Sequence, residues 1–146
     1  MSIRVLFPAL LAAVVAVSVA GAARSPAPLA GVSRVTRGDT VLLYSAEQAE
    51  RGKAAFARTC KECHELEEFT GNDFRGKWDT RSVWELYEQI RTTMPDGNPG
   101  TLPREEYADV LAHLLAGNGL PAGPAALVAD SAALSAVRLP LPPKGL

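Results

Sequence analysis

The chain has 146 residues, with 15 Lys and Arg against 16 Asp and Glu, and a formal net charge of −1. Its basic residues are spread along the sequence without a cluster, so the composition excludes a nucleic-acid-binding surface. There are only two cysteines, which excludes a disulfide-rich scaffold, and the length suits one small domain rather than two.

The first 22 residues have the pattern of a secretory signal peptide. A short basic start, Met1–Arg4, precedes an almost entirely apolar run from Val5 to Ala20, and Ala20-Gly21-Ala22 fits the small-x-small cleavage rule. An uncleaved membrane anchor is the alternative, although 16 residues are few for about 30 Å of hydrocarbon. We therefore expect residues 1–22 to be removed and the protein to lie in the periplasm, with membrane attachment only if the segment stays.

Two regions follow the predicted signal peptide. Residues 23–43 contain much Pro, Ala, Gly and Ser and are predicted to be an N-terminal arm or linker. Residues 44–146 are predicted to be the folded domain, which ends in a Pro- and Ala-rich C-terminal tail.

The first predicted helix begins at a capping box. The Ser45 hydroxyl can accept from the Gln48 N–H, and Gln48 can reach back, which predicts a helix from Ala46 to about Thr59. One face of this helix carries its apolar and small residues, namely Ala49, Gly52 and Phe56.

Directly after this helix comes Cys60-Lys61-Glu62-Cys63-His64, the attachment signature of a c-type haem. On one helical turn the two sulfurs can form thioethers with the porphyrin vinyl groups, and the adjacent imidazole can bind the iron. A thioredoxin-like motif should follow a strand, and a structural zinc site would need a fourth ligand that only the distant His113 offers. The motif predicts one haem c per chain, attached at Cys60 and Cys63 and ligated by His64.

Two further helices are predicted downstream. One runs from Arg81 to about Thr92, capped by Thr80 or Asp79, and the other starts with Pro103 at its first position and ends before Gly117-Asn118-Gly119. A short turn is predicted at 126–134. No strand alternation is visible, so the expected class is all-α, with three main helices.

The helix entering the haem motif, the Thr93-Met94-Pro95 step and the last helix around Tyr107 together resemble a class I monohaem cytochrome c, over roughly Tyr44 to Leu134. The stretch from Tyr107 to Leu115 is also similar to small cytochromes associated with periplasmic quinoprotein dehydrogenases. The resemblance implies a cytochrome c-like domain wrapped around one haem. It also implies that the first and last helices cross, with Gly52 and Phe56 against Tyr107 and Leu111.

Met94 is the candidate for the sixth iron ligand. The only other methionine is Met1, so Met94 is the available thioether, and it lies in a loop that the family motif matches. A methionine that fills a packing gap is the alternative. A second imidazole ligand from His113 is also considered, but the helical wheel places His113 on the polar face, as a solvated surface residue.

Trp78 has two open interpretations. It could donate its indole N–H to a haem propionate, as in similar cytochromes, or it could simply be packed. Many class I cytochromes have a proline soon after the haem motif whose carbonyl holds the proximal histidine. Residues 65–77 contain none, so the partner of the His64 Nδ1–H is not identified. Glu65, Glu67 and Glu68 are interpreted as a solvated acidic face, or as a guide for a basic partner.

The predicted function is one-electron transfer and not catalysis, because a His and a Met ligand would fill both axial positions of the iron. The expected partners are a redox protein that donates electrons, such as a periplasmic dehydrogenase, and a respiratory acceptor. Two alternatives stay open. The chain could be a haem c subunit held permanently in a dehydrogenase complex, or it could bind a gas or peroxide at an iron from which Met94 is easily released.

Overall fold

The computed structural model describes residues 42–141. The predicted signal peptide, almost all of the N-terminal arm and the end of the tail lie outside this range. The described residues form six helical segments: α1 (Ala46–Thr59), the 3-10 helix η1 (Leu66–Phe69), α2 (Asn72–Trp78), α3 (Val83–Thr93), α4 (Arg104–Gly117) and α5 (Ser131–Ser135). Two isolated bridges, Ser45–Gly123 and Ser82–Arg138, are the only extended pairings between residues 42 and 141. The predicted all-α class is confirmed.

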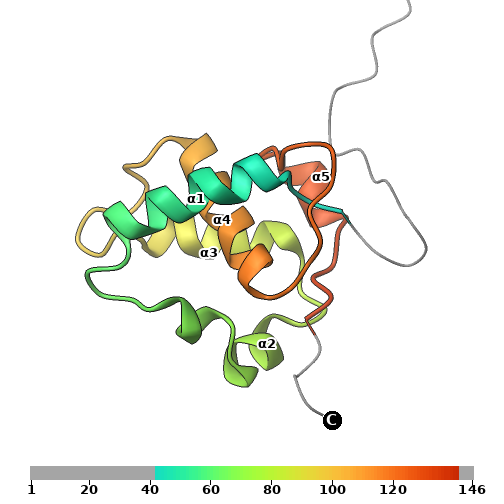
Figure 1. Cartoon of the computed structure of the whole chain (residues 1–146), viewed down its shortest axis with the longest axis horizontal. Coiled ribbons are helices and arrows are strands. Elements are labelled where there is room, and N and C mark those ends of the chain that lie inside the picture. Colours follow the sequence, from blue (N-terminus) through green and yellow to red (C-terminus); the bar gives the residue numbers. More distant parts are fainter. Residues whose placement is uncertain (1–41, 142–146) are drawn as a thin grey trace, which may run out of the picture.

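Helices α1 and α4 cross at the centre of the domain (Figure 1). The Ser45 side chain caps α1 by accepting from the Gln48 N–H, as predicted. The other half of the predicted capping box is wrong, because the Gln48 side chain does not reach back to Ser45 but donates to the Leu127 carbonyl at 2.9 Å and accepts from the Leu127 N–H at 2.6 Å. At the crossing, a Cβ on Gly52 would lie 1.8 Å from the Asp109 carbonyl oxygen, so only glycine permits this approach. The helices cross as expected, but the residues in contact differ from those predicted. Gly52 approaches Asp109, and Phe56 packs in a small cluster with Val110 and Leu114, rather than against Tyr107 and Leu111.

Helix α3 starts two residues later than the sequence analysis predicted, and its predicted cap is wrong. Ser82, not Thr80 or Asp79, is the N-cap: its hydroxyl accepts from the Glu85 N–H, while the Glu85 carboxylate accepts from the Ser82 N–H. Thr80 has a φ of 63°, in the left-handed region, whereas an N-cap residue is normally extended.

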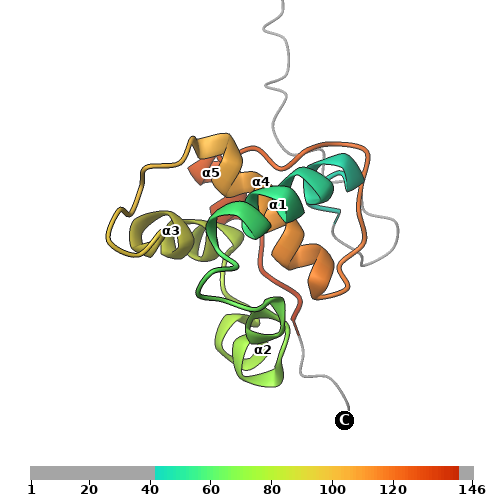
Figure 2. The same ribbon diagram turned by 60° about the vertical axis from the view of Figure 1, so that its left-hand side comes forward.

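Helix α4 likewise begins one residue after the predicted position, with Pro103 as its N-cap. At its other end, Asn118 is buried and joins three elements. Its side-chain nitrogen donates to the carbonyls of Phe69, 2.7 Å away, and Leu114, 2.9 Å away, and its side-chain oxygen accepts from Arg75 at 2.8 Å. This network holds η1 and α2 against the end of α4. In two views, α2 is set apart from the α1–α4 crossing (Figure 2).

The segment after α4 completes the core. Leu134, Leu139 and Leu141 are almost fully buried. Leu139 exchanges backbone hydrogen bonds with the residues just before α3, donating to the Arg81 carbonyl and accepting from the Thr80 N–H. The short turn predicted at 126–134 is replaced by α5, which begins at Ser131. Between residues 42 and 141, no helix is long and apolar enough to cross a membrane.

Candidate functional site

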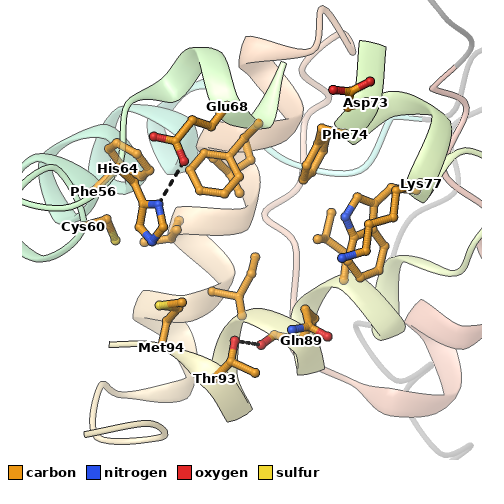
Figure 3. A pocket seen from close by; sticks show the side chains of 16 residues that line it. Phe56, Cys60, His64, Glu68, Asp73, Phe74, Lys77, Gln89, Thr93 and Met94 are labelled. Atoms are coloured by element: carbon orange, nitrogen blue, oxygen red, sulfur yellow. Dashed lines mark hydrogen bonds and ion pairs between the residues drawn. The ribbon is translucent and has the colours of Figure 1, made fainter. Parts of the chain in front are cut away.

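A cavity of about 380 Å³ lies between the end of α1, the η1–α2 segment, α3 and α4. This volume is within the range of small-molecule and cofactor sites. Half of the residues that line it are apolar or aromatic: Phe56, Phe69, Phe74, Trp78, Leu86, Ile90, Val110 and Leu114. Cys60, His64 and Met94 also line it (Figure 3). The fold therefore brings together four of the five predicted site residues, Cys60, His64, Trp78 and Met94, which are up to 34 positions apart in the sequence, whereas Cys63 does not line the cavity.

The two cysteines lie on the turn that follows α1. Cys60 is the C-cap of the helix, and its carbonyl accepts from the N–H groups of Cys63, at 3.1 Å, and His64, at 3.0 Å. Cys60 is half-buried at the cavity, whereas Cys63 is exposed one turn further on. Burial, together with the nearby Glu106 carboxylate, raises the pKa of the Cys60 thiol, so the neutral thiol is favoured.

His64 is held from one side and faces the cavity with the other. Its Nδ1 lies 3.1 Å from Oε2 of Glu68, and its ring packs edge-on against Phe69 with the ring centroids 5.3 Å apart. The ring nitrogen that does not contact Glu68 is turned toward the Met94 side of the cavity (Figure 3). Because an ionised carboxylate can only accept, this contact favours the tautomer of a neutral imidazole that has its proton on Nδ1, so that Nε2 would be the nitrogen available to a metal.

Glu68 is the residue that the sequence analysis missed. It was interpreted as part of a solvated acidic face, but its carboxylate bonds both His64 and the Glu65 backbone N–H, the latter at 2.9 Å. The hydrogen bond from Glu65, followed by that from His64, lowers the pKa of Glu68 below its usual value. Two features of the sequence could have identified Glu68: the Glu65-x-x-Glu68 spacing of a capping box, and the position of Glu68 four residues after His64.

Met94 reaches the cavity from the C-cap position of α3. Its backbone is fixed at both ends, because its N–H donates to Ile90 at 2.9 Å and its carbonyl accepts from the Tyr107 hydroxyl at 2.8 Å. In the close view, Met94 and His64 lie on facing sides of the cavity (Figure 3).

His113, the alternative second ligand, is not among the residues that line the cavity. The prediction that it is a solvated surface residue is wrong, because its ring lies against Phe56 with centroids 5.6 Å apart. Burial, and to a smaller extent Lys53, lowers the pKa of His113. Within residues 42–141, no group of three or more His, Cys, Asp or Glu side chains is arranged to share a metal ion.

Trp78 lines the cavity and is also part of the core, with only 3% of its surface exposed. Two cationic groups lie over its ring, with Arg81 Cζ 4.7 Å and Lys77 Nζ 5.4 Å from the centroid. Lys77 also lines the cavity, at the end opposite Cys60 and His64 (Figure 3). This end therefore offers two donors that suit carboxylate groups of a ligand, the indole N–H and the Lys77 ammonium, although the Asp73 carboxylate also lines the cavity on the α2 side.

These residues fit an iron porphyrin. The cavity has a mainly apolar and aromatic wall, a thiol lies at one end, an imidazole nitrogen and a thioether occupy facing sides, and the Lys77 ammonium lies at the other end. Soft thioether and imidazole donors are the axial ligands that haem iron takes in cytochromes c.

Comparison with known proteins gives one match. Residues 47–114 match the family model described as cytochrome C oxidase, cbb3-type, subunit III. Neither the comparison with curated proteins nor the comparison with solved structures found a match. The matched segment, just under half of the chain, contains the attachment motif, η1 to α3, Met94 and most of α4. The match and the cavity together support a c-type cytochrome domain, with a haem and haem-based electron transfer.

Proposed function

We propose that this chain is a one-electron carrier with one haem c attached covalently at Cys60 and Cys63, and with His64 and Met94 as the axial ligands of its iron. The observation that supports this most strongly is the position of Cys60, His64 and Met94 around one apolar cavity.

When bound, the haem supplies a reversible couple between ferrous and ferric iron. The residues of the chain would determine the reduction potential of that couple. The Met94 sulfur would be a soft ligand that favours the ferrous form, and the apolar and aromatic part of the lining would limit the access of water to the iron. With two protein ligands on the iron there is no open position for a substrate, so we propose electron transfer rather than catalysis.

Trp78 and Lys77 are proposed to receive the propionate groups. The indole N–H is a donor, and the Lys77 ammonium lies near the ring at the far end of the cavity. This keeps the function that the sequence suggested for Trp78, beside its role in packing.

We further propose that the protein works in the periplasm, exported by residues 1–22, between a dehydrogenase and a respiratory acceptor. The resemblance to cytochromes associated with quinoprotein dehydrogenases suggests the kind of donor. The exposed side of Cys63 and the exposed loop from Asp96 to Gly100 are the surface through which electrons would pass.

A permanent subunit of a respiratory complex is the second candidate, because the matching family model is described as an oxidase subunit. A free carrier elutes from a size-exclusion column as a monomer after extraction under mild conditions. A permanent subunit elutes with other chains of fixed stoichiometry.

Met94→Ala in the holoprotein tests the proposed ligation. We expect the haem to stay attached after acid–organic extraction, because Cys60 and Cys63 are unchanged. The reduced iron should bind carbon monoxide and the reduction potential should fall, since the thioether is lost. Thr93→Ala is the matched control, because Thr93 lines the same cavity without a sulfur atom.

A Met94→Ala spectrum and potential equal to those of the parent would exclude Met94 as a ligand. If the parent itself binds carbon monoxide readily, Met94 is a labile ligand and the gas-binding alternative is favoured. Haem that can be extracted from the parent contradicts covalent attachment.

A further inference from the structure

We infer that Glu68 is a positioning residue for the axial imidazole, and that its carboxylate lowers the reduction potential of the iron that His64 would bind. This inference rests on the proposed function and deepens it, because it names a residue that sets the potential.

The carboxylate of Glu68 is held at both oxygens. Oε1 accepts from the Glu65 N–H at 2.9 Å, and Oε2 lies 3.1 Å from Nδ1 of His64. The first contact belongs to the capping box of η1, in which the Glu65 side chain in turn accepts from the Glu68 N–H. Backbone geometry therefore places this carboxylate, although the side chain itself is exposed.

The His64 ring is fixed between two groups. Glu68 holds the ring at Nδ1, and Phe69 packs its edge at 63° to the imidazole plane. Both residues belong to η1, so one short helix determines the orientation of the ring. With the Nδ1 hydrogen donated to Glu68, Nε2 is the nitrogen available to iron.

A charged acceptor does more than orient the ring. A hydrogen bond to a carboxylate is stronger than one to a neutral carbonyl and raises the basicity of the imidazole. A more basic imidazole stabilises ferric iron relative to ferrous iron, as does a nearby negative charge. The contact with Glu68 therefore opposes the effect of the Met94 thioether, which favours ferrous iron.

Glu68→Gln in the holoprotein tests this role. Gln has nearly the same shape and can still accept a hydrogen bond, but it has no charge. Glu67→Gln is the matched control, because it removes the same charge from the neighbouring exposed position in η1, and the Glu67 side chain makes no hydrogen bond within the described residues. We expect the potential to rise in Glu68→Gln by several times the change in Glu67→Gln.

A spectroscopic measurement on the parent gives an independent test. In the ferrous, diamagnetic holoprotein, the His64 Nδ1–H proton should show a nuclear Overhauser contact with the Glu68 side chain. Its resonance should move upfield in Glu68→Gln, because the neutral acceptor forms a weaker hydrogen bond.

The outcomes separate the two proposals. The role of Glu68 is overturned if the two variants change the potential equally, or if the parent shows no Overhauser contact. The proposed function still stands in that case, provided that the parent has covalent haem and a reversible one-electron wave. A parent without covalent haem overturns both.

Discussion

Tyr107 connects the last long helix to the loop that carries Met94. Its ring is 1% exposed, and its hydroxyl donates to the Met94 carbonyl at 2.8 Å and accepts from the Leu102 N–H at 3.4 Å. The ring belongs to the main hydrophobic core cluster. The hydroxyl has a second role, because it holds the backbone of the proposed iron ligand.

Tyr107→Phe should release Met94 more easily from the ferric iron. The loss of these two part-buried hydrogen bonds should also lower the free energy of unfolding by about 1–3 kcal/mol. The expected result is a higher affinity of the ferric holoprotein for imidazole or cyanide, measured by optical titration.

Tyr87→Phe is the matched control for this prediction. Tyr87 is equally buried, and its hydroxyl donates to the Arg104 carbonyl at 3.2 Å rather than to Met94. A similar gain in ligand affinity in both variants would mean that general loosening, and not the contact with Met94, is responsible.

At the scale of the elements, the α1–α4 crossing is the contact that fixes the position of the attachment motif. Since Cys60 directly follows α1, any displacement of α1 relative to α4 also moves the thiol relative to the cavity. Ion pairs border the crossing, with Arg51 bonded to Asp109 at 2.9 Å and Arg58 bonded to Glu106. Their arginines are largely exposed, so we expect them to contribute little compared with the close approach at Gly52.

Gly52→Ala should destabilise the domain by roughly 1–3 kcal/mol or more, because its methyl group would overlap the backbone of Asp109 and no side chain could move to make room. Gly76→Ala is the control, since nothing lies within 4 Å of a Cβ at this position in α2. It should stabilise by about 0.5–1 kcal/mol through helix propensity. Urea unfolding of both variants checks the prediction, and equal effects would contradict it.

The long helices could be predicted from the sequence because they span several turns and have capping residues. Helix α1 matches its predicted bounds, since Ser45 and Gln48 form a local signal. Helices α2 and α5, with seven and five residues, are too short to show a period. Tertiary contacts determine them, such as the buried hydrogen bonds of Arg75 with Asn118.

Part of the site could be predicted from the sequence, and part of it could not. Covalent chemistry restricts the attachment motif to a fixed spacing, so Cys60, Cys63 and His64 could be identified without a fold. The position of His113 could not, because a helical wheel does not include the neighbouring helix, whose Phe56 covers the imidazole. The contact of Glu68 with His64 depends on the turn that η1 makes after the motif.

At the scale of the whole molecule, charge near the proposed exit for electrons should affect the rate of encounter with a partner. Glu67 is exposed beside the turn that carries Cys63, whereas Glu68 is occupied by His64. Glu67→Lys should change the salt dependence of reduction by the physiological donor more than it changes the potential. Asn98→Lys, in the exposed loop after Met94, should slow the same reaction.

Glu50→Lys provides the control for both changes. Glu50 is exposed on α1, ten residues before Cys60, or about 15 Å along the helix. Stopped-flow reduction at several ionic strengths is the measurement. If Glu50→Lys alters the rate as much as the other two variants do, the proposed docking surface is wrong.

The late position of Leu134, Leu139 and Leu141 in the sequence has a consequence for the order of events as the proposed exported chain emerges from the membrane. These side chains complete the same core cluster as Leu43 and Tyr44, at the other end of the described residues. The cluster therefore cannot close until nearly the whole chain has emerged, while Cys60 and Cys63 emerge about halfway through. During this interval the two thiols belong to an unfinished domain, and they are open to the enzymes that would join them to haem before folding encloses the cavity.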